Sequence, residues 1–294
     1  MQLKNIKKEI ENLVQNKYIG GIKMNVKRIL TAIVGLPVVS LLLIFGNKYI
    51  MDVVIAIIAI IAMYEYSKCI SSEAKFISVI GYVTAALIAF IHIVPDMILS
   101  TVITLGVPIL LFAIFFAVII TDMKITFKDA AFSFIGILYI VGFLGFLPIL
   151  YGVTGEISGK FLIWFVIFAS WGSDAFAYWV GKHLGKHKFS SVSPNKTIEG
   201  CIGGIIGAGI FSLIGAFVMN TCFDVEISYQ TISIVSAILS LIGQVGDFSA
   251  SVIKRYFDVK DFSELFPGHG GMIDRIDSVM FISPFAYFLL TMFL

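Results

Sequence analysis

Long runs of apolar residues, separated by short polar stretches, fill the chain from residue 29 onward. The runs lack the period-two alternation of membrane-spanning β-strands. A helix of roughly 20 apolar residues crosses the hydrocarbon core of a bilayer. The pattern therefore predicts an all-α, polytopic integral membrane protein with about nine transmembrane helices. We expect these helices over residues 29–46, 49–66, 76–94, 98–120, 130–152, 161–181, 202–220, 231–250 and 277–294.

The composition agrees with a membrane protein. Of the 294 residues, 59% are hydrophobic and 14% are charged, whereas a soluble domain carries about 25% charged residues. The net charge of +2 provides no general basic field, so nucleic acid is not an expected partner. The three cysteines (Cys69, Cys201 and Cys222) have no metal-binding or redox spacing, and we interpret them as structural.

The chain divides into a short extension and one long domain. Residues 1–23 form a polar, basic N-terminal extension, and Met24 is followed at once by Lys27, Arg28 and the first apolar run. No Pro- or Ser-rich linker and no internal repeat interrupts residues 24–294, which we predict to be a single membrane-embedded domain. We expect a chain that begins at Met24 to insert and to be active.

The distribution of lysine and arginine predicts the orientation. With the N-terminus in the cytosol, 19 of the 21 basic residues fall on the cytosolic side, and only Lys48 and Lys160 fall outside. Cytosolic loops of membrane proteins carry such an excess of positive charge. We therefore expect a multi-pass protein of the cytoplasmic (inner) membrane, with loops 182–200 and 251–276 facing the cytosol.

These two loops hold the candidate chemistry. Loop 251–276 offers cations suited to phosphate, with arginine as a bidentate fork and lysine as a point charge: Lys254, Arg255, Lys260 and Arg275. Its glycines, Gly268, Gly270 and Gly271, permit close backbone approach to a ligand. An ordinary basic cytosolic loop is the alternative interpretation.

Carboxylates lie close to these cations in the sequence. Asp274 and Asp277 are three residues apart and share a face of the last helix. Asp247 lies in the eighth predicted span, where an unpaired carboxylate is costly. Mg²⁺ is typically bound by one or two carboxylates plus substrate phosphates. The pattern therefore suggests a metal beside a cationic phosphate pocket.

Asp174, in the sixth predicted span, is expected to face the bundle interior for the same reason. It would line a substrate or metal pocket, or form a structural hydrogen bond. Glu65, near an inner helix end, is interpreted as structural or interfacial. Four glycines, at 203, 204, 207 and 209, predict a smooth helix face for close packing.

The exact residues strengthen the hypothesis. From Ser251 to Asp277 the chain reads SVIKR, four residues, then KDFSELFPGHGGMIDRID. This run resembles the diagnostic motif of the phosphatidate cytidylyltransferase (CDP-diacylglycerol synthase) family. The upstream SPNKTIEG, from Ser193 to Gly200, and the pair Gly246-Asp247 also resemble that family.

The resemblance implies transfer of CMP from CTP to phosphatidate, which gives CDP-diacylglycerol and pyrophosphate for phospholipid biosynthesis. It implies Asp247 and Asp274 as metal ligands, in a paired-metal centre for which K⁺ beside Mg²⁺ is one option. Asp261 and Asp277 would orient the cations, and a homodimer is a family-level expectation. The residues implied to bind substrate or act in catalysis are Asp174, Ser193, Asn195, Lys196, Thr197, Lys254, Arg255, Lys260, His269, Gly270, Gly271 and Arg275.

Two other functions compete with this interpretation. A CTP-dependent polyprenol or phytol kinase has a similar acidic and basic site but would transfer the γ-phosphoryl group. A transporter would use Asp174 and Asp247 as coupling sites within the membrane. The concentration of polar residues in two cytosolic loops, without inverted-repeat symmetry, argues against a transporter.

Overall fold

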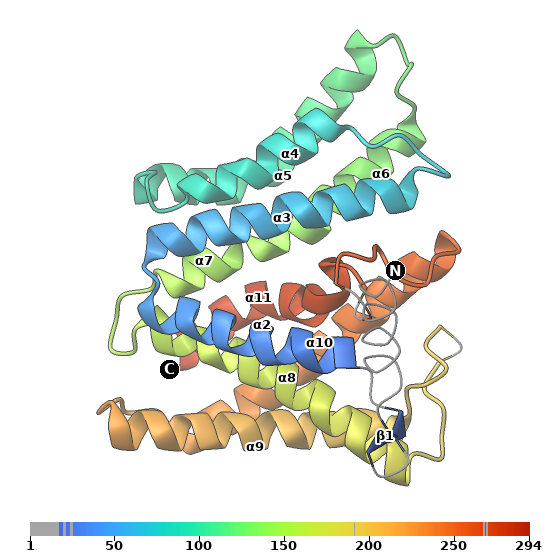
Figure 1. Cartoon of the computed structure of the whole chain (residues 1–294). Coiled ribbons are helices and arrows are strands. Elements are labelled where there is room, and N and C mark those ends of the chain that lie inside the picture. Colours follow the sequence, from blue (N-terminus) through green and yellow to red (C-terminus); the bar gives the residue numbers. More distant parts are fainter. Residues whose placement is uncertain (1–17, 20–21, 24–25, 191, 267, 269) are drawn as a thin grey trace, which may run out of the picture.

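The computed structural model describes residues 18–19, 22–23, 26–190, 192–266, 268 and 270–294 (Figure 1). Apart from a short antiparallel hairpin of β1 (Tyr18–Ile19) and β2 (Ile22–Lys23), the described elements are helices. They are α2 (Val26–Phe45), α3 (Lys48–Ile70), α4 (Ser78–Leu87) with the 3₁₀ turn η1 (Ile88–Phe90), α5 (Asp96–Ile120), α6 (Phe127–Ile137), the π-helical segment η2 (Leu138–Gly142), α7 (Phe146–Tyr151), α8 (Gly159–Leu184), α9 (Ile198–Cys222), α10 (Tyr229–Tyr256) and α11 (Ile273–Phe293).

Within the described residues, seven helical stretches are long and apolar enough to cross a bilayer. They are Lys48–Ile70, Asp96–Ile120, Phe127–Tyr151, Gly159–Leu184, Ile198–Cys222, Tyr229–Tyr256 and Ile273–Phe293. The prediction of an all-α, multi-pass membrane protein is thereby confirmed.

Two of the nine expected spans differ from the other seven. The helix expected over 76–94 is the shorter segment Ser78–Phe90, and 13 residues rise only about 20 Å. The helix expected over 29–46 corresponds to α2, whose first side chains lie outside the described part.

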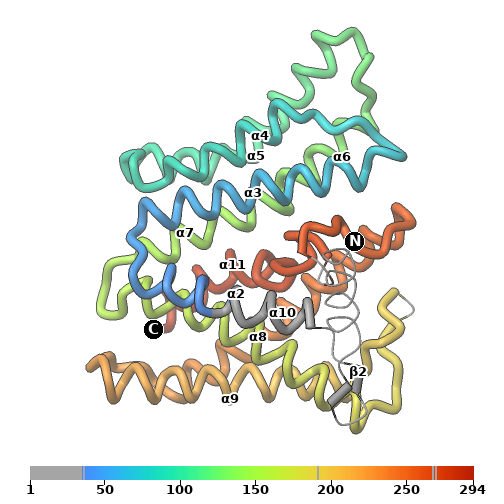
Figure 2. The backbone as a smooth tube through the Cα atoms, viewed as in Figure 1, coloured from blue at the N-terminus to red at the C-terminus, as the bar shows by residue number. Residues whose placement is uncertain are grey.

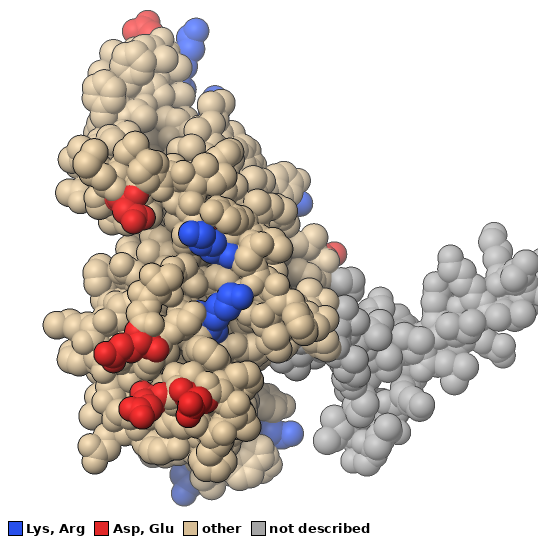
Figure 3. Space-filling model, turned by 90° about the vertical axis from the view of Figure 1, so that its left-hand side faces the viewer, with Lys and Arg blue, Asp and Glu red and all other residues tan. Residues whose placement is uncertain are grey.

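Successive helices reverse direction, so their connections alternate between two ends of the bundle (Figures 1 and 2). The loops at one end, here called the basic end, are residues 71–77, 121–126, 185–197 and 257–272. Those at the opposite end are 46–47, 91–95, 152–158 and 223–228, and they contain no lysine or arginine. Figure 3 views that opposite end and shows acidic side chains on it together with a few basic ones; Lys48 and Lys160 lie there, in the first turns of α3 and α8. The charge asymmetry expected from the sequence therefore coincides with the two ends of the fold.

The segment between Phe127 and Tyr151 is not a regular α-helix. It widens into a π-turn at η2 and is interrupted before α7 begins at Phe146. Pro148 has no N–H and cannot donate to the carbonyl of Leu144, which is consistent with this break. The irregular segment places Tyr139 in the interior, where it is 8% exposed.

Close glycine contacts join α8 to α9. A Cβ atom on Gly207 would lie 2.4 Å from the Cβ of Phe176 and 2.6 Å from the carbonyl oxygen of Gly172. Gly203 and Gly204 are similarly tight, but a Cβ on Gly209 would meet nothing within 4 Å. The expected packing role therefore holds for three of the four glycines and is wrong for Gly209, which faces away from the contact.

A polar network links α8, α9 and α10 beneath the basic end. The Ser240 hydroxyl donates to Ser173 Oγ over 2.9 Å, and Gln244 Nε2 donates to the Cys201 carbonyl over 3.0 Å. Gln244 also lies within hydrogen-bond distance of both serine hydroxyls. Hydrogen bonds between helices are a common means of association in lipid, and this network fixes the register of the helices that carry the polar site.

Gly207→Ala should lower the free energy of unfolding by about 1–3 kcal/mol, because its methyl group would overlap Phe176 and the backbone of Gly172. Gly209→Ala is the matched control, and it should be neutral or gain up to about 1 kcal/mol from the helix preference of alanine. Denaturant unfolding of the purified protein in detergent measures both. Equal losses in the two variants would contradict the proposed packing.

Candidate active site

The two loops predicted to carry the chemistry both lie at the basic end, and the first of them docks on α10. Phe189 stacks on Phe248 with ring centroids 4.6 Å apart. Arg255 Nε donates to the carbonyl of Val192 over 3.5 Å. Thr197 ends this loop by capping α9, because its hydroxyl accepts the N–H of Gly200 over 3.1 Å. Loop 185–197 is therefore held at its middle and at its C-terminal end.

An ion pair between Lys196 and Asp247 lies at this contact. Both side chains are about a quarter exposed, and the ammonium group of Lys196 lies 4.4 Å from the centroid of the Phe248 ring. Gly246 lets α11 approach, since a Cβ there would be 2.8 Å from the carbonyl oxygen of Asp277. Asp247 is thus accessible, paired with a cation, and close to the N-terminal part of α11.

Asp274 has a different environment. Its Oδ1 accepts a 2.6 Å hydrogen bond from Lys254 Nζ, and its Oδ2 accepts the N–H groups of Phe262 and Gly271, each over 2.9 Å. The side chain is 3% exposed. Charge-assisted hydrogen bonds of this kind are strong. Asp274 therefore holds loop 257–272 and Lys254 in place, and a metal could bind it only by displacing one of these partners.

Asp174 and Asp277 lie within electrostatic range of Asp247. Asp277 is buried and accepts the N–H of Ser278 over 2.8 Å, but none of the described basic side chains forms an ion pair with it. Asp174 is exposed although it lies in the middle of α8, and Lys196 and Arg275 are also in electrostatic range. Three carboxylates therefore approach one region between α8, α10 and α11.

Glu65 of α3 proves to be part of the support for this site. Its side chain is buried, and its Oε1 accepts the Ser263 hydroxyl over 2.6 Å and the Met272 N–H over 2.8 Å. Its Oε2 accepts the N–H of Ile273 over 2.9 Å. The first N–H groups of a helix have no partner within the helix, and Glu65 satisfies them at the start of α11. The expectation of a structural or interfacial role did not identify this contact, which joins residues about 200 positions apart.

Glycines in loop 257–272 allow backbone angles and close contacts that a residue with a side chain would not. Gly268 and Gly270 both have φ of 81°, a region that other residues rarely adopt. A Cβ on Gly270 would lie 2.8 Å from Asp274 Oδ2 and 3.3 Å from Asp261 Oδ1, and one on Gly271 would lie 2.5 Å from Glu65 Oε2. The loop therefore closes tightly around these carboxylates.

The other predicted residues surround this region. Arg255, Lys260, Asp261 and Arg275 are exposed, as are Asn195 and Pro194, whereas Ser193 is half-buried. His269 lies outside the described residues. These exposed cations are accessible to a ligand that approaches from solvent, although Arg255 also donates to the carbonyl of Val192.

The donor set fits a magnesium ion that is completed by substrate. Among the described residues, no three His, Cys, Asp or Glu side chains converge closely enough to hold an ion alone. Mg²⁺ in phosphate-transfer sites commonly takes one or two carboxylates and substrate phosphates. Asp247 is accessible, and Asp277 is a buried carboxylate without a described cation partner. These two features suit a bound cation.

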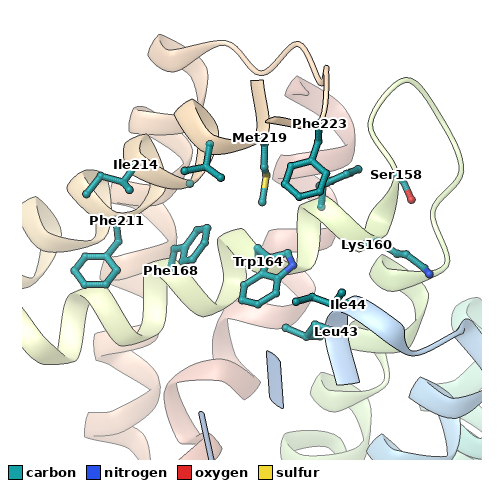
Figure 4. A pocket seen from close by; sticks show the side chains of 13 residues that line it. Leu43, Ile44, Ser158, Lys160, Trp164, Phe168, Phe211, Ile214, Met219 and Phe223 are labelled. Atoms are coloured by element: carbon teal, nitrogen blue, oxygen red, sulfur yellow. The ribbon is translucent and has the colours of Figure 1, made fainter. Parts of the chain in front are cut away.

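A separate apolar pocket lies near the opposite end of the bundle (Figure 4). It has a volume of about 630 Å³ and is lined by α2, α8 and α9 residues that include Leu43, Trp164 and Phe211. Lys160 is the one charged side chain in its lining. Among the described residues, its lining has no carboxylate and no cluster of cations, unlike the polar region at the basic end.

Comparisons with known proteins agree with one another. Residues 26–293 match the profile of the Cytidylyltransferase family. A phosphatidate cytidylyltransferase of Staphylococcus saprophyticus is 35% identical over 272 residues, which cover 90% of this chain and 98% of the relative. One of Bacillus subtilis strain 168 is 31% identical over 279 residues, which cover 91% of this chain and 98% of the relative.

The Glu65 contact predicts a selective loosening of the site loop. Glu65→Gln replaces one acceptor oxygen by a donor, leaving a buried N–H of Met272 or Ile273 unpaired at a cost of about 1–3 kcal/mol. Hydrogen exchange should accelerate in residues 262–276. Glu73→Gln, the same change in an exposed pair with Lys128, should leave that exchange as in the wild type. Unchanged protection in Glu65→Gln would rule out the anchoring role.

Proposed function

The chain belongs to the cytidylyltransferase family, and we propose that its reaction takes place at the basic end, among Lys196, Asp247 and the loop that precedes α11. The enzyme makes CDP-diacylglycerol from CTP and phosphatidate. One observation carries the placement: loop 185–197 brings Lys196 onto Asp247 of α10, and the end of α10 brings Lys254 onto Asp274 of α11. Two anionic substrates require such a concentration of compensating charge.

The reaction needs alignment more than acid–base chemistry. An oxygen of the phosphatidate phosphate attacks the α-phosphorus of CTP, and the bond to pyrophosphate breaks. That oxygen is already ionised, so no general base is required. Positioning and electrostatic stabilisation therefore supply most of the rate enhancement. In our proposal, Lys196 exchanges its contact with Asp247 for a substrate phosphate, and Lys254 is held ready by Asp274.

Magnesium, when bound, would screen the repulsion between the two substrates and the leaving pyrophosphate. Asp247 is the ligand that the accessible geometry favours, together with the nearby Asp277. Asp274 was the second ligand expected from the sequence, and its three existing contacts favour a positioning role instead. A second ion such as K⁺ remains part of the proposal.

The remaining residues have proposed roles that follow from their positions. Arg255, Lys260 and Arg275 are exposed cations that would bind phosphates, and Asp261 would orient them across Gly270. Thr197 acts through the start of α9. The residues proposed to contact substrate directly are Asp174, Ser193, Asn195, Lys196, His269, Gly270 and Gly271.

We propose nine membrane crossings, with α2 and the short segment Ser78–Phe90 added to the seven long stretches. The alternation of the connections and the lysine-rich loops support a cytosolic basic end and N-terminus in the cytoplasmic membrane. Residues 1–23 precede the region matched by the family profile, and we propose that they are dispensable. A homodimer is proposed from the family resemblance.

Magnesium titration separates the roles of the three aspartates. Asp247→Asn and Asp277→Asn should insert normally and lose nearly all CDP-diacylglycerol formation, with partial recovery at high Mg²⁺ because a ligand has been weakened. Asp274→Asn should also lose activity, without recovery, because the loop and Lys254 are no longer held.

The measurement is turnover at equal membrane protein over a range of Mg²⁺ concentrations. Lys68→Gln is the control, a change of an exposed cation outside the site, and it should retain activity. Near-normal turnover of both Asp247→Asn and Asp277→Asn at limiting Mg²⁺ would show that the proposed metal site is wrong.

The proposed topology is open to cysteine labelling. The exposed Cys222 lies at the end of α9 opposite the basic end, so a membrane-impermeant maleimide should label it in intact cells. Lys186→Cys in a Cys222→Ser background should react only after permeabilisation, because residue 186 lies in a basic-end loop. Labelling of residue 186 from outside would invert the assigned orientation.

A further inference from the structure

A buried tyrosine hydroxyl next to the site has no partner. Among the described residues, three buried hydroxyl groups lack a hydrogen bond: those of Tyr139, Ser212 and Ser236. A serine in a helix can satisfy itself by rotating toward a carbonyl of its own preceding turn. The phenolic hydroxyl of tyrosine is too far from its own backbone to do so. Tyr139 is therefore the one whose missing partner must come from elsewhere.

The surroundings of Tyr139 place it beside the site carboxylates. Its ring makes an edge contact with Phe281, with centroids 5.7 Å apart. Phe281 follows Asp277 by four residues on α11, and a Cβ on Gly246 would lie 2.6 Å from the Cβ of Phe281. Asp277 and Asp247 are both within electrostatic range of Tyr139. The tyrosine thus lies where α10 and α11 meet.

The backbone around Tyr139 is also unusual. The residue lies in the π-helical segment η2, between α6 and α7. Single π-turns inside α-helices are frequently found at functional sites. Within this wider turn, Tyr139 lies buried in the bundle interior.

We propose that the hydroxyl of Tyr139 donates a hydrogen bond to a phosphate oxygen of a bound substrate. This inference rests on the proposed function, which puts substrate phosphate beside Asp247 and Asp277. A phosphate oxygen is a charged acceptor, and a buried donor beside it forms a strong hydrogen bond. The substrate phosphates of CTP and of phosphatidate share this chemistry.

The proposal separates stability from substrate binding. An unpaired buried hydroxyl contributes no hydrogen bond to the ligand-free fold, so Tyr139→Phe should leave its thermal stability unchanged or slightly higher. The same change should lower the affinity for the substrate whose phosphate Tyr139 contacts by about ten- to a hundredfold. This is the cost of losing a hydrogen bond to a charged group.

Tyr66→Phe is the matched control. Tyr66 is also a buried tyrosine, but its hydroxyl donates to the carbonyl of Phe132 over 3.0 Å. Its removal should lower the melting temperature of the ligand-free protein and leave the KM values for both substrates near those of the wild type. Each variant loses one oxygen, but the proposal predicts opposite effects: Tyr139→Phe loses substrate affinity and keeps stability, whereas Tyr66→Phe loses stability and keeps substrate affinity.

The experiment uses the full-length purified protein and two readouts. The first is the thermal shift produced by CTP alone or by dioctanoyl phosphatidate alone, and the second is KM for each substrate. Tyr139→Phe should lose the shift and raise KM for the one substrate whose phosphate it contacts, and the separate arms identify that substrate. Wild-type shifts and KM values for both would overturn the inference, as would a loss of ligand-free stability equal to that of Tyr66→Phe.

Asp247→Asn distinguishes failure of this inference from failure of the proposed function. If Asp247→Asn is inactive while Tyr139→Phe binds both substrates normally, only the role of Tyr139 is wrong. If both variants retain wild-type activity, the reaction does not occur at this site.

Discussion

A carboxylate within a membrane-spanning bundle must be compensated, and the basic end of this protein is arranged around that requirement. Removing a charge from water costs several kcal/mol unless it is paired or hydrated. Asp247 meets the requirement through Lys196, and Asp274 through Lys254 and two backbone N–H groups. The first pair brings loop 185–197 onto α10 and the second joins α10 to α11, so the interactions that compensate these carboxylates also gather the cations that we propose bind phosphate.

The compensation is incomplete at the centre of the site. Asp277 has no described cation partner, Asp174 is exposed in the middle of α8, and the hydroxyl of Tyr139 is unpaired. Unsatisfied polar groups are costly in a finished core. In the proposed site, a metal and substrate phosphates would supply the missing charges and acceptors. The pattern of paired and unpaired groups in this proposed site outlines the space in which the substrates would meet.

The N-terminal helices contribute more than membrane anchorage. Glu65 extends from α3 to the start of α11 and holds the glycine-rich loop by three hydrogen bonds. The η2 segment, from the same half of the chain, places Tyr139 against Phe281. The resemblance visible in the sequence covered the C-terminal third, yet the residues that support it come from helices more than a hundred positions earlier.

The sequence was sufficient to predict the helical membrane fold and the two basic loops that lie at one end of the bundle, because these features follow from local hydrophobicity and from a motif. The roles of the acidic and basic residues in these loops stay predictions. The sequence could not predict the partner of Glu65, since one acidic residue near a helix end carries no signal of a contact 207 residues away. Asp277 was expected to orient cations, and this stays a prediction, since both Lys254 and other carboxylates lie within electrostatic range of it. Gly209 shared the spacing of its neighbours and yet faces away from α8. Each difference depends on how helices turn against one another, which periodicity alone does not determine.

The central claim is that this site transfers the α-phosphate of CTP, and isotope tracing tests it most directly. Purified protein supplied with phosphatidate should incorporate label from α-³²P CTP into lipid and release γ-³²P label as pyrophosphate. Incorporation of the γ-label into lipid, with release of CDP, would contradict the account.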